Sequence, residues 1–169
     1  MSTKSGKIRG HRFHGDPARF EVVADYVAEK YIGRVIYIAD VAGGQGMLSR
    51  FLNKKYNFKT DVIDPRGYTL VGVNNRKEEY RAEMASYYDL IIGIHPDEAL
   101  KNVVSSSLVK PVIVIPCCNF WSSEETLGRD ALLAKIEEFY KINGVKSERV
   151  VFSFHGPKNV GLVSEPPSK

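Results

Sequence analysis

One stretch of this sequence decides the fold: Val35-Ile36-Tyr37-Ile38-Ala39-Asp40-Val41-Ala42-Gly43-Gly44-Gln45-Gly46. It begins with an apolar run of the length of one buried strand. An acid and a glycine-rich turn follow, and residues without a Cβ let a ligand approach the backbone closely. A dinucleotide fingerprint would read Gly-x-Gly-x-x-Gly beside a pyrophosphate. Because Asp40 would repel an anion and attract a cation, the turn predicts a ligand with a cationic amino-acid group.

Three further strands are predicted to end in polar residues. Asp61-Val62-Ile63 ends at Asp64, about 20 residues beyond the glycine turn, where nucleotide-binding α/β folds place an acid that accepts hydrogen bonds from ribose hydroxyls. The apolar runs 89–94 and 111–116 are followed by His95-Pro96-Asp97 and Cys117-Cys118-Asn119. In open α/β sheets, ligands bind beyond the carboxyl ends of the strands, so these side chains are predicted to meet at one site.

Helical spacing of apolar residues alternates with these strands. Predicted helices run from Asp16-Pro17 to Gly33, through Met47–Leu52, through Ala99–Leu108, and through Leu132–Tyr140 after a capping box at Ser122–Glu125. Residues 67–77 are predicted as a loop, with a short strand near Tyr80–Met84 and a terminal hairpin of 149–154 and 160–163. The alternation predicts a mainly parallel sheet covered on both faces.

Together these features resemble the class I S-adenosylmethionine-dependent methyltransferases, over residues 34 to 165. The resemblance implies an α/β, Rossmann-like fold: a mainly parallel seven-stranded sheet with helices on both faces and a C-terminal antiparallel hairpin. It also implies a methyltransferase enzyme with S-adenosyl-L-methionine as cofactor. The implied cofactor-binding residues are Asp40, Ala42, Gly43, Gly44, Gly46, Asp64, Met84 and His95. Two departures stand out: Ala42 replaces a glycine, and residues 66–86 contain no clear helix.

His95-Pro96-Asp97-Glu98 occupies the position where amino-methylating members of that family carry Asp/Asn/Ser-Pro-Pro-aromatic. Methylating an exocyclic amine requires its lone pair to point at the methyl group and its protons to find acceptors. The resemblance therefore makes His95 and Asp97 candidate catalytic residues and Pro96 a candidate substrate contact. A purely structural alternative remains open, in which Pro96 begins a helix whose positive end Asp97 and Glu98 favour.

Cys117 and Cys118 suggest a second chemistry. Pyrimidine C5 RNA methyltransferases place a thiolate nucleophile at this strand end, which makes Cys118, or Cys117, a catalytic candidate. The alternative is a buried small apolar side chain. Neighbouring residues on a strand point to opposite faces, so no bond between the two thiols is expected. Asn119, Phe120 and Trp121 are candidates to hold a flipped base, although Trp121 could equally pack under the next helix.

Basic residues near the N-terminus point to a polyanionic partner. Residues 1–15 are predicted to form a basic arm, in which Arg9, Arg12 and His14 are candidate substrate contacts, ahead of a single domain at 16–169. The HPDE and PCC motifs resemble a small archaeal-type group that methylates the N4 amine of a ribosomal-RNA cytidine. We therefore expect RNA (rRNA or tRNA) as partner, possibly within an assembling ribosomal subunit. A methyltransferase acting on a small molecule or protein is one alternative. A non-catalytic partner that binds the cofactor only to stabilise a complex is another.

Composition sets the remaining bounds. The chain has 169 residues and a formal net charge of +4, and it contains no run of roughly 18 apolar residues that could span a membrane. Its N-terminus lacks the apolar core of a signal peptide, so a cytoplasmic location is expected. Gln45 is the only glutamine among many charged residues, a bias typical of thermophiles. No metal site is predicted, and both monomer and homodimer remain open.

Overall fold

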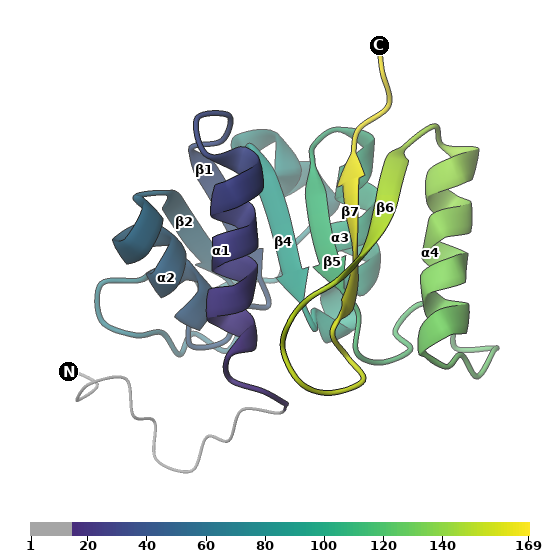
Figure 1. Cartoon of the computed structure of the whole chain (residues 1–169), viewed down its shortest axis with the longest axis horizontal. Helices are drawn as coiled ribbons and strands as arrows, with labels where there is room; N and C mark the ends of the chain where they lie inside the picture. The colour runs from purple at the N-terminus through teal and green to yellow at the C-terminus, as the bar shows by residue number, and fades with distance from the viewer. Residues whose placement is uncertain (1–14) are drawn as a thin grey trace.

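The computed structural model describes residues 15–169, which form a seven-stranded sheet flanked by helices. The elements occur in the order α1 (Arg19–Tyr31), β1 (Tyr37–Val41), α2 (Met47–Tyr56), β2 (Lys59–Ile63), β3 (Asn74–Arg76), η2 (Ala82–Tyr87), β4 (Leu90–Ile94), η3 (Asp97–Ala99), α3 (Leu100–Ser105), η4 (Ser106–Leu108), β5 (Val112–Ile115), α4 (Arg129–Ile142), β6 (Lys146–Val151) and β7 (Val160–Glu165). The η elements are 3₁₀-helical. Figure 1 shows the strands side by side across the molecule, with α1 and α2 in front of the sheet.

The strand order in the sheet is β3-β2-β1-β4-β5-β7-β6. The pairs from β3 to β5 are parallel, whereas β7 runs antiparallel to both β5 and β6. The predicted C-terminal hairpin is therefore confirmed, as is the mainly parallel seven-stranded sheet. Because these five strands are parallel, their carboxyl ends lie along one edge of the sheet, toward which the arrowheads of β4 and β5 point in Figure 1.

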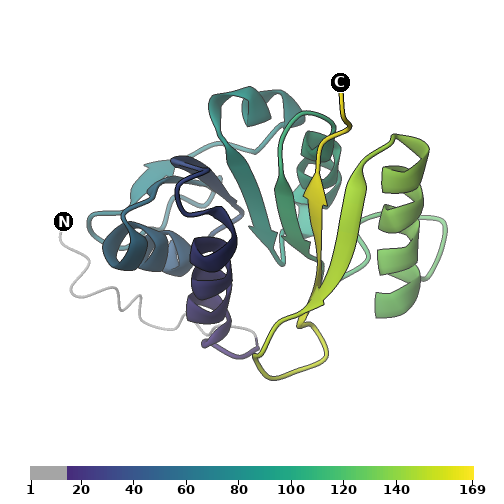
Figure 2. The ribbon, with the colours of Figure 1, turned by 45° about the horizontal axis from the view of Figure 1, so that its top comes forward.

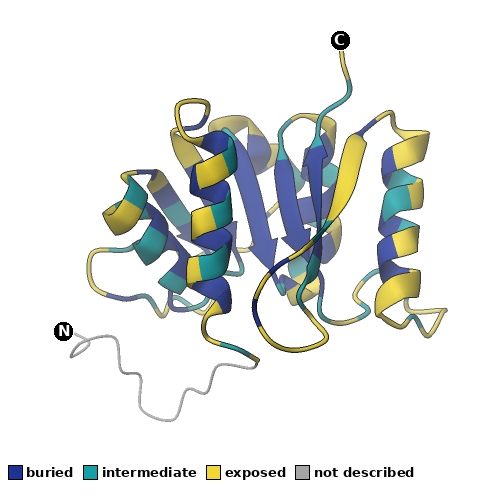
Figure 3. Ribbon diagram, in the orientation of Figure 1, coloured by how far each residue is buried: buried dark blue, intermediate teal, exposed yellow. Residues whose placement is uncertain are grey.

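Helices cover both faces of the sheet. Since successive residues on a strand point to opposite sides, each strand contributes side chains to both helix layers. Ile38, Leu90 and Ile92 pack with α1 and α2, whereas Ala39 and Ile91 pack with α3 and α4. Figure 3 shows the central strands buried and β6, at the sheet edge, largely exposed. This double burial explains why the parallel strands read as continuous apolar runs.

The segment between β2 and β4 differs from prediction. The strand expected near Tyr80–Met84 is wrong: β3 is instead the polar segment Asn74–Arg76, inside the predicted loop. Tyr80, Met84 and Tyr88 are buried at helical spacing, and the 3₁₀ helix η2 carries part of this set. An edge strand held by backbone pairing to β2 needs no apolar alternation, so the sequence pattern could not reveal it.

The predicted capping box before α4 is also wrong. Helix α4 begins at Arg129, after Gly128. The Ser122 hydroxyl does accept from the backbone N–H groups of Glu124 and Glu125, at 3.2 Å each, but the Asn119 side chain holds the same residues in a closed turn. Nδ2 of Asn119 donates to the carbonyls of Ser122 and Glu125, which keeps this segment out of the helix.

The first helix starts slightly later than expected from Asp16-Pro17. Helix α1 begins at Arg19, and Asp16 accepts a hydrogen bond from the Ala18 N–H at 2.9 Å in the preceding turn. The predicted basic arm, including Arg9, Arg12 and His14, lies outside the described residues apart from Gly15. Within residues 15–169, no helix has the length and apolar character needed to cross a bilayer.

Candidate active site

A cleft of about 910 Å³ opens at the carboxyl ends of β1, β4 and β5. Its floor includes Asp40 and the glycine turn, and its far side includes His95, Asp97, Cys117 and Cys118. The start of α1 and the β6–β7 loop close the remaining side. The two segments lie side by side in Figures 1 and 2, and the His155 N–H donates to the Asp16 carboxylate at 3.0 Å. The structure thus brings the predicted cofactor turn and the predicted catalytic groups into one site.

The glycine turn is shaped by close packing. Gly46 has a φ of +82°, and a Cβ there would come within 2.7 Å of the Val73 side chain and 3.0 Å of Val62. A Cβ on Gly43 would lie 2.6 Å from the Asp40 carboxyl group. Ala42 itself adopts a left-handed φ of +53°, a conformation that costs a residue with a Cβ about 1–2 kcal/mol. The turn therefore lies directly over the Asp40 carboxylate.

Asp40 is a buried acid, with 2% of its surface exposed. Its Oδ2 accepts from the Ser49 N–H at 3.2 Å and from the Ser49 hydroxyl at 2.8 Å, which ties strand β1 to the first turn of α2. Burial raises the pKa of Asp40 to about 7, since the hydrogen bonds from Ser49 offset only part of the desolvation. A cationic group in the cleft would favour the ionised form of this carboxyl.

Asp64, at the end of β2, is 1% exposed and is fully engaged. One oxygen accepts from the Gly44 N–H at 2.9 Å and from Nη2 of Arg66 at 2.6 Å, and the other accepts from the Arg66 backbone and Nε. Burial would raise the pKa of Asp64, but the hydrogen bonds from Arg66 and Gly44 outweigh it and lower that pKa. Asp64 therefore holds the glycine turn as an ionised carboxylate.

The side of the cleft that contains His95 and Asp97 has a strained backbone. His95 and Asp97 have φ angles of +52° and +48°, although neither is glycine. Such residues are uncommon and gather at functional sites. Buried Pro96 lies between them and packs over Gly93, where a Cβ would come within 3.1 Å of the proline ring. Glycine and proline together let the chain turn sharply after β4 and present both side chains to the cleft.

The protonation of His95 follows from its partner. Its Nε2 lies 3.1 Å from the Lys158 carbonyl oxygen, which can only accept a hydrogen bond, so Nε2 carries the proton. Burial lowers the pKa of His95, and the charges of Arg19 and Lys158 act in the same direction. The imidazole is therefore neutral near pH 7, with Nδ1 as its acceptor nitrogen.

The two cysteines differ in their surroundings. The sequence argument that they point apart is wrong, because β5 ends at Ile115 and the two sulfur atoms lie 3.5 Å from each other beyond it. Cys117 donates to Oδ1 of Asp97 at 3.1 Å, and burial together with this bond raises the pKa of its thiol. Exposed Cys118 instead has the Lys158 ammonium 3.8 Å from its sulfur. The atoms of Asp97, Cys117 and Cys118 that could bind a metal ion lie within 4.8 Å of one another. The positive charge of the Lys158 ammonium would repel a metal cation there.

Seven of the predicted site residues within 15–169 do not line the cleft: Gly46, Asp64, Met84, Pro96, Asn119, Phe120 and Trp121. Met84 belongs to η2 and is buried in the core, where its sulfur accepts from the Arg81 N–H at 3.4 Å. Trp121 packs edge-on against Phe139 of α4, with ring centroids 5.9 Å apart. Its surroundings therefore match the alternative in which Trp121 packs under the next helix. Phe120 is 41% exposed, and Asn119 holds its own turn. Their proposed substrate contacts stay predictions.

Arg66 and Lys158 are among the cleft residues that were missed from the sequence. Arg66 binds Asp64, and its position directly after Asp64-Pro65 was a usable signal. Lys158 contacts both His95 and Cys118 from the β6–β7 loop, which sequence spacing alone cannot place beside them.

Comparison with known proteins identifies the fold. No family model and no curated protein matches the chain. Among solved structures it is similar to the ribosomal protein L11 methylase of Lactobacillus delbrueckii subsp. bulgaricus, with a TM-score of 0.57 and 16% identity over 89% of this chain and 80% of that one. It is similar to a sugar N-methyltransferase from Streptoalloteichus (0.56, 12%, 99% of each chain). It is also similar to the S-adenosylmethionine-dependent methyltransferase SibL (0.52, 16%, 89% of this chain and 56% of that one). The chain has the α/β fold of the class I methyltransferases.

Proposed function

We propose that this protein is an S-adenosylmethionine-dependent methyltransferase that modifies an exocyclic amine of an RNA base, with N4 of a ribosomal-RNA cytidine as the favoured target. One observation carries the proposal. A single cleft joins a glycine turn over a buried acid to a neutral histidine whose free ring nitrogen is an acceptor. Methyl transfer from a cationic donor to an amine requires both of these parts.

The cofactor half fits the donor. A volume of about 910 Å³ is typical of a pocket that holds a nucleoside-sized ligand together with part of a second molecule. Asp40 and the glycine turn would hold the methionine end, where the amino group is cationic, and Asp64 would receive the ribose hydroxyls. Since Arg66 now covers the Asp64 carboxylate, its half-exposed side chain must move aside for ribose to bind. When bound, the cofactor supplies a methyl group activated by a sulfonium.

The acceptor half fits an amine. A base amino group needs acceptors for its protons so that its lone pair faces the methyl group, and transfer then depends mostly on positioning. Nδ1 of His95 and the carboxylate of Asp97 are such acceptors on the cleft wall. Cys117 donates to one Asp97 oxygen and thereby orients the carboxylate. The strained backbone of both residues is consistent with preorganised acceptors.

The choice of RNA rests on charge and on the motifs. The net charge is +4, and the first twenty residues hold five of the basic side chains (Lys4, Lys7, Arg9, Arg12 and Arg19). Such a distribution favours a polyanionic substrate. The HPDE and PCC motifs resemble enzymes that act on ribosomal RNA, which favours cytidine N4 among the base amines.

The test is methyl transfer by the full-length protein. Purified chain is incubated with methyl-labelled cofactor and either total RNA or ribosomal subunits from cells lacking the gene, and the nucleosides are then separated and identified by mass spectrometry. We expect label in N4-methylcytidine. Label confined to protein or to small molecules, with none in RNA, would contradict the proposal.

The contact between Lys158 and Cys118 supports a second candidate, C5 methylation of a pyrimidine. The contact places an ammonium 3.8 Å from an exposed cysteine sulfur, the atom type that acts as nucleophile in that mechanism. It also selects Cys118 over Cys117, whose proton is held by Asp97. RNA containing 5-fluorocytidine distinguishes the routes: the C5 route traps a covalent adduct that Cys118→Ala abolishes, and the amine route traps none.

A further inference from the structure

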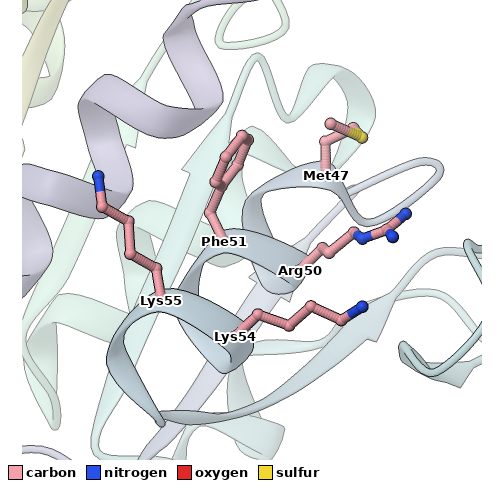
Figure 4. Close-up of a pocket in the computed structure, with 5 residues that line it drawn as sticks. All are labelled: Met47, Arg50, Phe51, Lys54 and Lys55. Carbon is pink, nitrogen blue, oxygen red and sulfur yellow. The ribbon is translucent and has the colours of Figure 1, made fainter.

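The outer face of α2 carries a second, smaller hollow of about 230 Å³, lined by Met47, Arg50, Phe51, Lys54 and Lys55. We call it the α2 groove. Figure 4 shows Arg50 and Lys54 extending in the same direction from the helix, while Lys55 reaches the opposite way, toward α1. The groove begins at the cleft end of the helix, because Leu48, directly after Met47, and Gln45, two residues before it, line the cleft.

The arrangement of charges along α2 slightly destabilises this helix. The segment Met47–Tyr56 contains three cations and no acid. Arg50 and Lys54 are four residues apart on one face, where like charges destabilise a helix by a few tenths of a kcal/mol. Lys55 is neutralised by Glu21 and Asp25 of α1, at 3.1 and 2.8 Å. Among residues 15–169, neither Arg50 nor Lys54 forms an ion pair, so both charges are available to an anion.

Two apolar side chains lie beside these free charges. Phe51 and Met47 are half-buried, with their inner surfaces packed against the core formed by α1, α2 and the sheet. Their outer surfaces contribute to the groove. An aromatic ring flanked by unpaired cations is the arrangement with which proteins bind single-stranded nucleic acid: the cations contact phosphates and the ring stacks on a base.

We propose that the α2 groove binds the backbone of a single-stranded segment of the RNA substrate and leads it to the cleft. This inference rests on the proposed function, because it names the path of that function's substrate. Charge complementarity selects the occupant, since Arg50 and Lys54 lie on the side of α2 away from the acids of α1. Each phosphate bound in this way releases counterions, and RNA binding through the groove is therefore dependent on salt.

The test compares two charge-neutralised variants. Arg50→Gln with Lys54→Gln removes the groove cations and keeps good helix-forming residues. Lys141→Gln with Lys146→Gln removes the same charge from exposed positions on α4 and β6, at the other end of the sheet. Binding of a short fluorescein-labelled single-stranded RNA is measured by anisotropy over a range of salt concentrations. The groove variant should bind about 10- to 30-fold more weakly at about 0.1 M salt, with a slope of log affinity against log salt that is smaller by about 1.4. The control should match the wild type.

A third variant isolates stacking. Phe51→Leu keeps an apolar side chain against the core, so it should weaken RNA binding about tenfold at every salt concentration and leave the salt slope unchanged. Thermal unfolding shows that each variant is folded. Equal RNA affinity and slope in the groove variant and the wild type would overturn the inference, and so would a wild type that binds an oligoglutamate peptide but not RNA.

Cofactor titration in the same variants keeps this inference separate from the proposed function. Affinity for S-adenosylmethionine should be unchanged in all of them. A protein that binds RNA through Arg50 and Lys54 but binds no S-adenosylmethionine would disprove the proposed function and leave the groove intact.

Discussion

The two halves of the cleft are built in opposite ways. On the cofactor half, Asp40 and Asp64 are 2% and 1% exposed, and hydrogen bonds from the backbone and from neighbouring side chains hold them. On the acceptor half, Asp97 and Cys118 are exposed, and His95 and Asp97 adopt left-handed backbone conformations. The cofactor half is buried and hydrogen-bonded, whereas the acceptor half is exposed, and left-handed non-glycine residues occur in both, at Ala42 and at His95 and Asp97.

This difference indicates a division of labour. A buried, fully bonded half suits a small ligand of constant shape, and its carboxyl groups also hold α2 and the glycine turn in place. An exposed half with accessible acceptors and thiols can contact part of a much larger substrate. Substitutions in the cofactor half should therefore affect stability and cofactor affinity together, and substitutions in the acceptor half should affect transfer alone.

The largest effect is expected at the glycine turn. Gly46→Ala combines an unfavourable φ with a Cβ within 2.7 Å of Val73, so the free energy of unfolding should fall by about 2–5 kcal/mol, with loss of cofactor binding. Gly72 is the matched control, because its φ is +81° but nothing lies within 4 Å of a Cβ there. Gly72→Ala should cost only about 1–2 kcal/mol of backbone strain. Equal losses in urea unfolding would show that packing at the turn does not matter.

Asp97→Asn should separate the two halves most clearly. It removes the charge that accepts the amine protons but keeps an oxygen for the Cys117 thiol. Single-turnover transfer to RNA should slow about 100-fold, the size typical of a lost proton acceptor. Affinity for the cofactor, measured by calorimetry, should not change. A parallel loss of cofactor affinity would mean that the halves are not independent.

Asp64→Ala should weaken cofactor binding by about 1–3 kcal/mol, because it leaves the Gly44 N–H and the ribose hydroxyls without an acceptor. Asp61→Ala, three residues earlier in β2, is its control: Asp61 bonds Tyr88 and Asn74, whereas Asp64 bonds Gly44 of the glycine turn. Calorimetry that finds equal cofactor affinities for the two variants would remove Asp64 from the ribose site.

The smallest effect is expected at Cys118. If the target is an amine, Cys118→Ala should change the transfer rate by less than about threefold, since a thiol that forms no bond in the reaction supplies no transition-state interaction. Loss of all transfer in this variant, together with an adduct on fluorinated RNA in the wild type, would replace the amine route with the C5 route.

The sequence predicted the part of the fold that burial controls. The alternating environments of Ile38 and Ala39, or of Ile91 and Ile92, require apolar residues at consecutive positions, so the parallel strands are visible as runs. The positions of Asp40 and the glycine turn followed from the same rule, because they come directly after a buried strand. Segments held mainly by backbone pairing, such as β3, carry no such pattern and were assigned wrongly.

The site was predictable only where chain order determines position. His95, Asp97 and Cys117 follow strands that are neighbours in the sheet, and they meet as expected. Lys158 reaches His95 from a hairpin loop, and the fold of that loop depends on contacts such as Asp16 with His155 across the molecule. No local pattern records such a contact. The relation of the two cysteines was missed for a local reason, because strand geometry was assumed beyond the end of β5.

The most direct test is the pH dependence of cofactor binding. Burial holds the pKa of Asp40 at about 7, so the carboxyl is neutral below that pH and ionised above it. If it binds the cationic end of S-adenosylmethionine, affinity measured by calorimetry should rise about tenfold between about pH 6 and about pH 8. Asp40→Asn should bind weakly at both pH values, lose this rise and, because a buried charge is gone, unfold less readily at the higher pH. Undiminished affinity in Asp40→Asn, or no binding to the wild type at any pH, would contradict the account.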